Sequence, residues 1–182
     1  MIKKGILLLM FVTLLMLPMT VQAKTAVRYA TKTIALREKP KSKVIYRVKR
    51  NTKITVLKHN TTWSRVKYKD KVLYAPKKQL HSKKSVKKYT AHQLRRGGRL
   101  HWRGYTYTWY SQRVMPGRGL KIPGRHVDKN GYVCDKDDYI VVGSSVANKL
   151  KRVIVPTPFG KFGKCYDCGL IGSKHCDIYV AW

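Results

Sequence analysis

The chain has 182 residues, and its 40 lysines and arginines against 8 acidic residues give a formal net charge of +32. A chain of this length fits one domain or two small ones, and its charge favours anionic partners. The only long apolar run lies at the N-terminus, which excludes a protein with several membrane-spanning helices.

The N-terminal segment 1–23 has the parts of a secretory signal peptide. Lys3 and Lys4 precede an apolar run at 6–17, and Ala23 supplies a small residue at the cleavage position. The run is shorter than the ~20 residues that a spanning helix needs. We therefore expect cleavage, with an uncleaved anchor as the alternative. The mature chain is then extracellular, secreted or associated with the cell wall, and keeps no stable membrane span.

Residues 30–80 alternate apolar and polar side chains in short runs. Val44, Tyr46 and Val48 form one such run, and turn-forming residues such as Asn60 separate the runs. Five short strands at this spacing predict a small, closed or partly open β-barrel rather than a helical domain.

The following segment, 81–98, interrupts this pattern. It is polar and basic and ends in two glycines, so we interpret it as a basic linker. The alternative is a short surface helix that covers Val86, Tyr89 and Leu94.

Residues 100–182 return to short period-two runs that are rich in aromatic side chains. Asn130 and Gly131 are a strong signal for a hairpin turn, and a short helix is expected at 145–151. The chain therefore predicts an all-β fold, with a second small barrel after the linker.

The cysteines all lie in the last third of the chain: Cys134, Cys165, Cys168 and Cys176. An even number of cysteines in an exported chain predicts structural disulfides, although the sequence leaves their pairing open. The C-x-x-C spacing of Cys165 and Cys168 leaves two alternatives, a zinc site completed by the other two cysteines, or free and redox-active thiols. We expect disulfides and no metal.

Four stretches of the first predicted barrel follow a familiar pattern: LREKP at 36–40, VIYRVKRNTKITVL at 44–57, Trp63 with Val66 in a W-x-x-V strand, and VLYAPKKQL at 72–80. With them, this segment resembles a bacterial SH3 (SH3b) domain. Asn51 stands where family members usually have glycine, and asparagine tolerates the left-handed backbone conformation. The resemblance implies a module that targets the cell wall and binds peptidoglycan, often through its cross-bridge peptide.

Aromatic side chains in this module suggest a binding surface. Tyr46, Trp63, Tyr68 and Tyr74 would form a flat groove flanked by basic residues, suited to a peptide or to the face of a sugar. The alternative is that Trp63 and Tyr68 fill the barrel. In the second predicted barrel the candidate binding residue is Trp109.

The segment KCYDCGLIGSKHCDIYVAW at 164–182 combines a strand, an aspartate turn and an Ile-Asp-Val/Ile-Tyr type of strand. The region from about 105 to 182 thereby resembles the three-aspartate (3D) domain of cell-wall proteins, a double-psi β-barrel also found in lytic transglycosylases. The resemblance implies a six-stranded barrel with Asp167 at the turn and Asp177 on the strand. The first aspartate of the pattern would fall near 143–145, which holds no acidic residue.

Asp137 and Asp138, a few residues upstream, are the alternatives for that missing aspartate. Glycan cleavage needs a general acid, and a lytic transglycosylase manages with one carboxyl group because the sugar's own 6-hydroxyl displaces the leaving group. Asp167 is the candidate acid–base and Asp177 its support, and repulsion between the two would raise one pKa. The alternative is that both aspartates are structural.

Several residues bear on that choice. Lysines at 161, 164 and 174 would lower the pKa of a nearby carboxyl group, which works against a general acid. His126 and His175 are weaker candidates for proton transfer. The sequence contains no Ser-His-Asp spacing, no phosphate-binding glycine loop and no histidine-rich metal motif, so no cofactor is predicted.

Three functions remain for such a chain. The first is a secreted peptidoglycan-binding protein in which the first barrel targets the wall and the second binds glycan strands. The second is a peptidoglycan-cleaving enzyme of the lytic transglycosylase type. The third is a secreted binder of polyanions, such as teichoic acids, membranes or nucleic acid, that acts through its charge; the alternative to the third is a solvated surface of biased composition.

Overall fold

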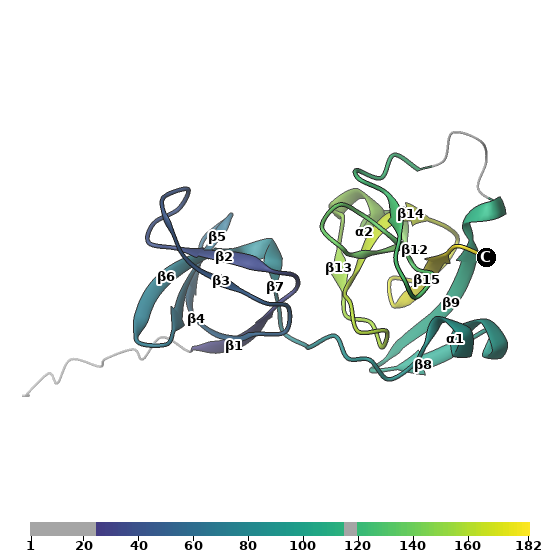
Figure 1. The fold of residues 1–182 in the computed structure, drawn as a ribbon, viewed down its shortest axis with the longest axis horizontal. Coiled ribbons are helices and arrows are strands. Elements are labelled where there is room, and N and C mark those ends of the chain that lie inside the picture. Colours follow the sequence, from purple (N-terminus) through teal and green to yellow (C-terminus); the bar gives the residue numbers. More distant parts are fainter. Residues whose placement is uncertain (1–24, 115–119) are drawn as a thin grey trace, which may run out of the picture.

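The computed structural model describes residues 25–114 and 120–182, which form two β units in succession along the chain (Figure 1). Strands account for 47% of the structure and helices for 12%, so the predicted all-β class is confirmed. The predicted signal peptide lies outside the described residues. Within those residues, helices are all too short or too polar to cross a bilayer.

The first unit is a curled seven-stranded sheet in the order β3-β2-β6-β5-β4-β1-β7 (Figure 1). Its strands are β1 (Ala26–Ala30), β2 (Ile34–Arg37), β3 (Val44–Val48), β4 (Lys53–His59), β5 (Trp63–Tyr68), β6 (Lys71–Pro76) and β7 (Leu80–His81), with a 3-10 turn η1 at Lys77–Gln79. Alternate side chains face inward, as in Ile54 and Val56 of β4, and build a closed apolar core. The structure thus has two strands more than the five predicted.

Asn51 connects β3 to β4 with a positive φ of 66°. The backbone amide of Asn51 donates to the Ala30 carbonyl oxygen at 2.8 Å, which ties this turn to the end of β1. The left-handed conformation expected at this position is therefore present, and an asparagine adopts it at little cost.

The second unit is an eight-stranded mixed sheet. Its strands are β8 (Leu100–Trp102), β9 (Tyr105–Ser111), β10 (His126–Val127), β11 (Val133–Cys134), β12 (Ile140–Ser144), β13 (Ile154–Val155), β14 (Gly163–Cys168) and β15 (His175–Val180); a 3-10 turn η2 spans Gln112–Val114. The main path runs β10-β11-β12-β15-β9-β8, and β14 joins β12 and β13. The β12–β14 and β15–β9 pairs are parallel. Strands β9 and β15, which are far apart in sequence, are thus neighbours within the sheet.

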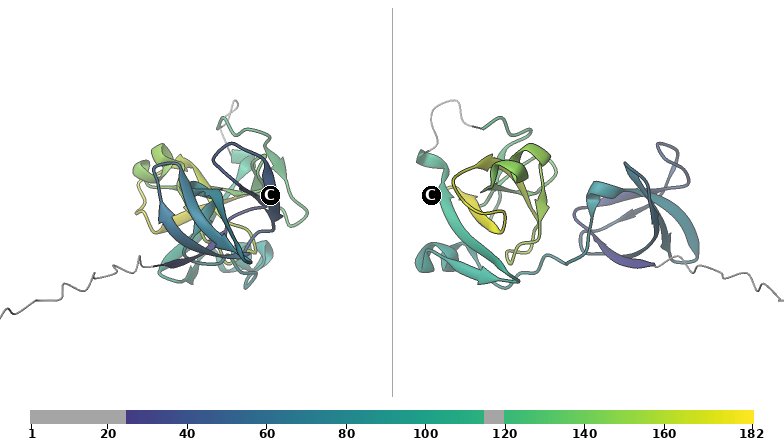
Figure 2. Two further views of the ribbon diagram at one scale, coloured as in Figure 1. Left: turned by 90° about the vertical axis from the view of Figure 1, so that its left-hand side faces the viewer. Right: turned by 180° about the vertical axis from the view of Figure 1, so that it is seen from behind.

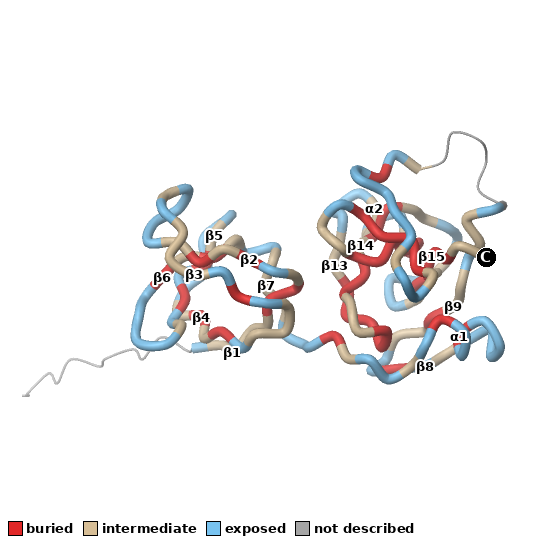
Figure 3. The backbone as a smooth tube through the Cα atoms, in the orientation of Figure 1, coloured by how far each residue is buried: buried red, intermediate tan, exposed pale blue. Residues whose placement is uncertain are grey.

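The predicted linker belongs in large part to this second unit. It contains helix α1 (Ala91–Gly97), where Thr90 and Gln93 form a capping box. Leu94 is fully buried, and Val86 and Tyr89 pack against the same core, shown in red and tan in Figure 3. A short helix is therefore present, as in the alternative interpretation, but it contains only Leu94 of the three residues, and Val86 and Tyr89 lie in the segment before it.

Two local predictions in the second unit are confirmed. Helix α2 (Val146–Lys151) follows Ser145, whose side chain accepts a hydrogen bond from the Asn148 amide. Gly131 has a φ of 82° in the turn between β10 and β11, and its amide donates to the Asp128 carbonyl oxygen at 2.9 Å.

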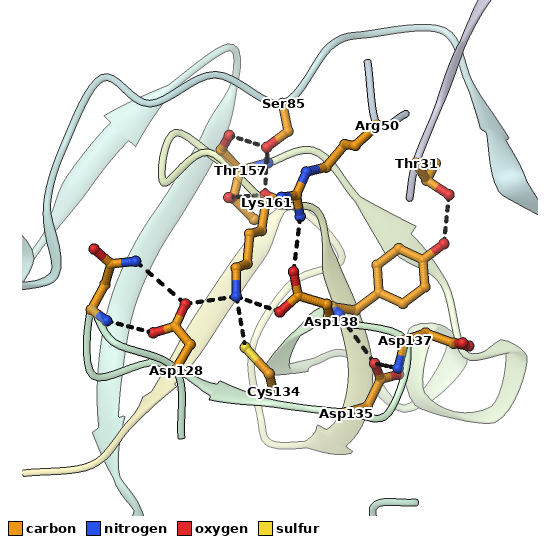
Figure 4. Close-up of polar contacts among 12 residues, drawn as sticks. Thr31, Arg50, Ser85, Asp128, Cys134, Asp135, Asp137, Asp138, Thr157 and Lys161 are labelled. Carbon is orange, nitrogen blue, oxygen red and sulfur yellow. Dashed lines mark hydrogen bonds and ion pairs between the residues drawn. The ribbon is translucent and has the colours of Figure 1, made fainter. Parts of the chain in front are cut away.

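The two units lie one after the other along the long axis of the molecule (Figure 2), and side chains of the turn between β11 and β12 contact the first unit (Figure 4). Lys32 of the first unit binds Asp137 at 2.6 Å, and Arg50 binds Asp138 at 3.4 Å. The Thr31 and Tyr139 hydroxyl groups lie 2.5 Å apart in a buried hydrogen bond. These contacts hold two separate cores together through polar groups rather than through apolar packing.

Candidate functional site

Asp167 and Asp177 meet on either side of Gly143. In the sheet Gly143 is the partner of Asp167 on β14 and of Asp177 on β15. A β carbon placed on Gly143 would lie 3.5 Å from the Asp177 β carbon and 3.8 Å from the Asp167 β carbon. The two carboxylates proposed from the 3D resemblance therefore lie on the same face of the sheet, on the two strands that flank β12.

Asp177 belongs to a chain of polar groups on β9 and β15. The Thr108 hydroxyl donates to Asp177 Oδ1, and the same hydroxyl lies 2.8 Å from His175 Nε2. A threonine hydroxyl has one proton, so it accepts from a protonated Nε2 while it donates to the carboxylate. His175 thus lies next to Asp177, at 3.8 Å from Oδ1, and the hydroxyl bridges the two.

Asp167 has a different partner, the buried Tyr179 of β15. The Tyr179 hydroxyl donates to Asp167 Oδ2. Burial, with the hydrogen bond to Asp167 and the nearby carboxylate charges, raises the pKa of Tyr179, so this phenol keeps its proton. Tyr110 of β9 packs on the Tyr179 ring with centroids 5.4 Å apart and is itself 39% exposed. The face therefore has an accessible aromatic ring beside a hydrogen-bonded carboxylate.

The end of this face is fixed by Ser144 and Asn148. The Ser144 hydroxyl donates to the His175 carbonyl oxygen at 2.7 Å. Asn148 Nδ2 donates to Ser144 Oγ at 3.0 Å and to the Ser173 carbonyl oxygen at 2.9 Å. These bonds position the start of β15, and with it His175 and Asp177, relative to β12.

Two of the three lysines expected to depress the aspartate pKa values, Lys161 and Lys164, have other partners. Lys161 lies between Asp128, at 2.7 Å, and Asp138. Lys164 lies 3.4 Å from Asp135. Asp137 and Asp138, the alternatives for the third aspartate, make interdomain ion pairs, and in the described residues they have no contact with Asp167 or Asp177. The residue between Asp167 and Asp177 in the sheet is Gly143, which has no side chain.

The four aromatic residues predicted as one groove lie on two faces of the first sheet. Alternate residues of β5 point in opposite directions, so Trp63 and Tyr68 separate. Tyr68 and Tyr46 pack against the core and against each other, with ring centroids 5.6 Å apart. Trp63 and Tyr74 lie on the outer face as diagonal neighbours on β5 and β6.

Trp109, the candidate binding residue of the second unit, is partly buried against the second core. Its side chain alternates with those of Thr108 and Tyr110 along β9, so it lies on the opposite face of the sheet from the aspartate pair. It contributes to packing there.

The predicted disulfides are not formed: all four cysteines are free, and three of them are buried. Cys165 and Cys176 lie on β14 and β15, which are separated by β12. Burial raises the pKa of the Cys134 and Cys176 thiols to about 12 and that of Cys165 to about 11. These thiols are protonated apolar side chains of the core at neutral pH.

His126, Cys134 and Asp138 place possible metal-ligand atoms within 4.8 Å of one another. The Lys161 ammonium lies among them, bonded to Asp138 and 3.6 Å from Cys134 Sγ (Figure 4). A cation of the chain itself thus occupies this position, which makes the cluster a poor metal centre.

Thr108, Gly143 and Tyr179 are the members of the face that sequence reasoning missed. Tyr179 has a detectable signal, because it follows Asp177 at the period of a strand. Thr108 and Gly143 become neighbours of the aspartates only through β15–β9 and β12–β14 pairing. Comparison of the chain with family models, curated proteins and solved structures finds no match.

Proposed function

We propose that the chain is an exported protein that binds peptidoglycan. The first barrel attaches to the wall, and the second holds a glycan strand on the face of Tyr110, Asp167 and Asp177. The observation that carries the proposal is this last arrangement: an exposed ring next to two hydrogen-bonded carboxylates offers a stacking surface and acceptors for sugar hydroxyls.

The outer face of the first barrel supports the same proposal. Trp63 and Tyr74 are exposed in part, and Arg65 is the strand partner of Tyr74. A flat aromatic pair beside a guanidinium group suits a peptide or a sugar more than it suits a barrel core, to which neither ring contributes.

The test is a pull-down of the mature chain with purified peptidoglycan sacculi at physiological salt. Trp63→Ala should lower the bound fraction several-fold, whereas Val27→Ala, a truncation at an exposed position of β1, which β4 separates from β5, should leave it unchanged. Equal retention of both variants and the parent would refute the role of Trp63. Retention that disappears between low and physiological salt would instead indicate a polyanion binder that acts by charge.

A second candidate, glycan cleavage, is favoured by the position of two carboxylates on either side of Gly143. One carboxyl group would protonate the leaving oxygen, and the sugar's 6-hydroxyl would attack the anomeric carbon as the glycosidic bond breaks. The carboxylate left behind would take up the proton of that hydroxyl. Mass spectrometry of the material released from sacculi tests this: anhydro-muropeptides should appear, and Asp167→Asn should abolish them. Asp70→Asn, with the same charge change on the first barrel, is the control. Binding without release of fragments would leave the wall-binding proposal alone.

A further inference from the structure

A pocket of about 240 Å³ lies in the second unit between α1, the hairpin turn at Gly131 and Trp182. Helix α1 and the C-terminus are on the side of this unit that faces away from the first unit (Figure 1). Its walls are largely aromatic, and basic side chains stand at its edge. The aromatic members are Tyr89, Tyr132, Phe159 and Trp182. Its size is slightly below that of pockets for drug-sized ligands, which suits a ligand of one ring or of one or two amino acids.

Two buried polar groups of this pocket have no partner. Within the described residues, the only side-chain nitrogen and oxygen atoms that are fully buried without a hydrogen bond are the Tyr132 hydroxyl and Trp182 Nε1, and both side chains line the pocket. Tyr132 is 2% exposed, and burial raises its pKa, so it remains a donor. An indole N–H is a donor only. Leaving such groups unpaired is costly, and native proteins rarely do so without a reason.

The pocket is built by specific backbone features. Gly131 has a φ of 82°, and a β carbon there would lie 2.7 Å from Trp182 Cζ3, so the indole ring lies directly on this glycine. The backbones of Tyr132 and Val180 form an isolated antiparallel β-bridge, and the Ala181 amide donates to the Gly131 carbonyl oxygen at 2.9 Å. On the other wall Lys87 forms a bridge with Phe159, whose ring centroid is 5.4 Å from that of Tyr132.

The charges at the edge of the pocket are positive. The Arg95 guanidinium carbon lies 5.5 Å from the centre of the Trp182 ring, and Lys87 and His92 complete the rim. The nearest acidic residue that acts on Tyr132 is Asp128, which is bound by Lys161. The Tyr132 hydroxyl and Trp182 Nε1 lie behind the surface of the pocket wall, each with less than 1 Å² of accessible area, so an acceptor reaches them when the aromatic side chains of the wall shift. The basic side chains at the edge would balance the charge of such an acceptor.

We propose that this pocket binds a small ligand that carries an oxyanion, a carboxylate or a phosphate, on a flat apolar body. The oxyanion accepts from the Tyr132 hydroxyl and from Trp182 Nε1 and is balanced by Arg95 and Lys87, while the apolar body stacks on the aromatic walls. The site is separate from the aspartate face, so it stands whether or not the chain binds peptidoglycan.

The test is calorimetric titration of the full chain with two probes, benzoylglycine for the carboxylate and phenyl phosphate for the phosphate, and with benzoylglycinamide as the uncharged control. At least one anion should bind and the amide should not. Tyr132→Phe and Arg95→Gln should each weaken the binding about tenfold. Arg96→Gln, the same charge change on the same helix but outside the pocket, should leave it unchanged.

A second readout is the indole N–H resonance of Trp182, which should shift on addition of the anion. This resonance is assigned as the peak that is missing from the NMR spectrum of Trp182→Phe. If neither anion binds at millimolar concentration, the proposal is wrong. It is equally wrong if Arg96→Gln weakens binding as much as Arg95→Gln, because the ligand would then be held by the general positive charge. Arg95 is exposed, so its substitution tests the site even where Tyr132→Phe disturbs folding.

Discussion

The hydroxyl groups of Thr31 and Tyr139 lie 2.5 Å apart although the residues belong to different β units and are separated by 108 positions in the chain. Both are buried, at 1% and 2% exposure. A buried polar contact of this kind makes the stability of one barrel depend on the other, because removal of one partner leaves the other in an apolar setting.

Tyr139→Phe should therefore destabilise the protein by about 1–3 kcal/mol. Chemical unfolding of the parent should show one transition for both barrels, and the variant should separate it into two. Tyr110→Phe, which removes an exposed hydroxyl from the second barrel, is the control and should change neither the midpoint nor the shape of the curve. A single transition with an unchanged midpoint for Tyr139→Phe would show that this hydrogen bond contributes neither to stability nor to the coupling of the two units.

The pair Asp128–Lys161 predicts loss of stability in acid. Burial opposes ionisation of Asp128, but hydrogen bonds from Lys161 and from two backbone amides outweigh it, so the pKa of this carboxyl is lowered below 3.8. A lowered carboxyl pKa contributes stability that is complete above the unfolded value and is lost as pH falls through the folded value.

The free energy of unfolding should thus fall between about pH 5 and about pH 2.5, and it should fall less steeply in Asp128→Asn. Urea unfolding at both pH values measures the difference. The pKa of Lys161 is raised by Asp128 and Asp138 despite burial, so its contribution is present below 10.5 and disappears only as pH rises through the higher folded value. A variant with the same acid dependence as the parent would contradict the assignment to Asp128.

Cysteine reactivity should follow burial. In native protein, a maleimide should modify Cys168 first, because its side chain is only half-buried. Cys134, Cys165 and Cys176 should react slowly, since burial both blocks access and raises the pKa of each thiol. Mass spectrometry counts the modified sites, and denatured protein without reductant should yield four. A count below four in the denatured protein would mean that disulfides form after all.

Two buried or half-buried glycines should respond differently to alanine. Gly131→Ala forces a side chain into a positive-φ position and against Trp182 at 2.7 Å, so we expect a loss of about 1–3 kcal/mol. Gly143→Ala meets its neighbours at 3.5–3.8 Å, an ordinary contact distance, and should cost less. Thermal unfolding of both variants gives the comparison. Equal losses would mean that the strain at Gly131 is relieved by movement of the indole ring.

The sequence identified the aspartates but not what lies between them. Asp167 and Asp177 carry a recognisable pattern, and period two predicted the strands around them. Their meeting at Gly143 depends on β12 lying between β14 and β15, parallel to the first and antiparallel to the second, and residue spacing does not encode this order. The same reason explains why Thr108 was missed, since it reaches Asp177 from a strand almost 70 residues away.

The aromatic residues and the cysteines show a second limit. Trp63 and Tyr68 differ by an odd number of positions, so period two alone separates them, and the expected single groove overlooked that parity. For the cysteines, an exported chain made disulfides the better expectation. In the fold, the three buried cysteines lie on β11, β14 and β15, and no two of these strands are paired with each other. The cysteines therefore act as buried side chains of the core and form no disulfide.

The six aspartates of the second unit each have a hydrogen-bond or ion-pair partner within the protein. Four of them pair with basic side chains, but they engage only Lys32, Arg50, Lys161 and Lys164. With 40 lysines and arginines against 8 acidic residues, most of the positive charge has no acidic partner in the chain. The surface must then be neutralised from outside, by a cloud of small anions that an incoming macromolecule displaces. Release of these counterions adds a favourable entropy to each encounter with a charged polymer, and the gain shrinks as salt concentration rises.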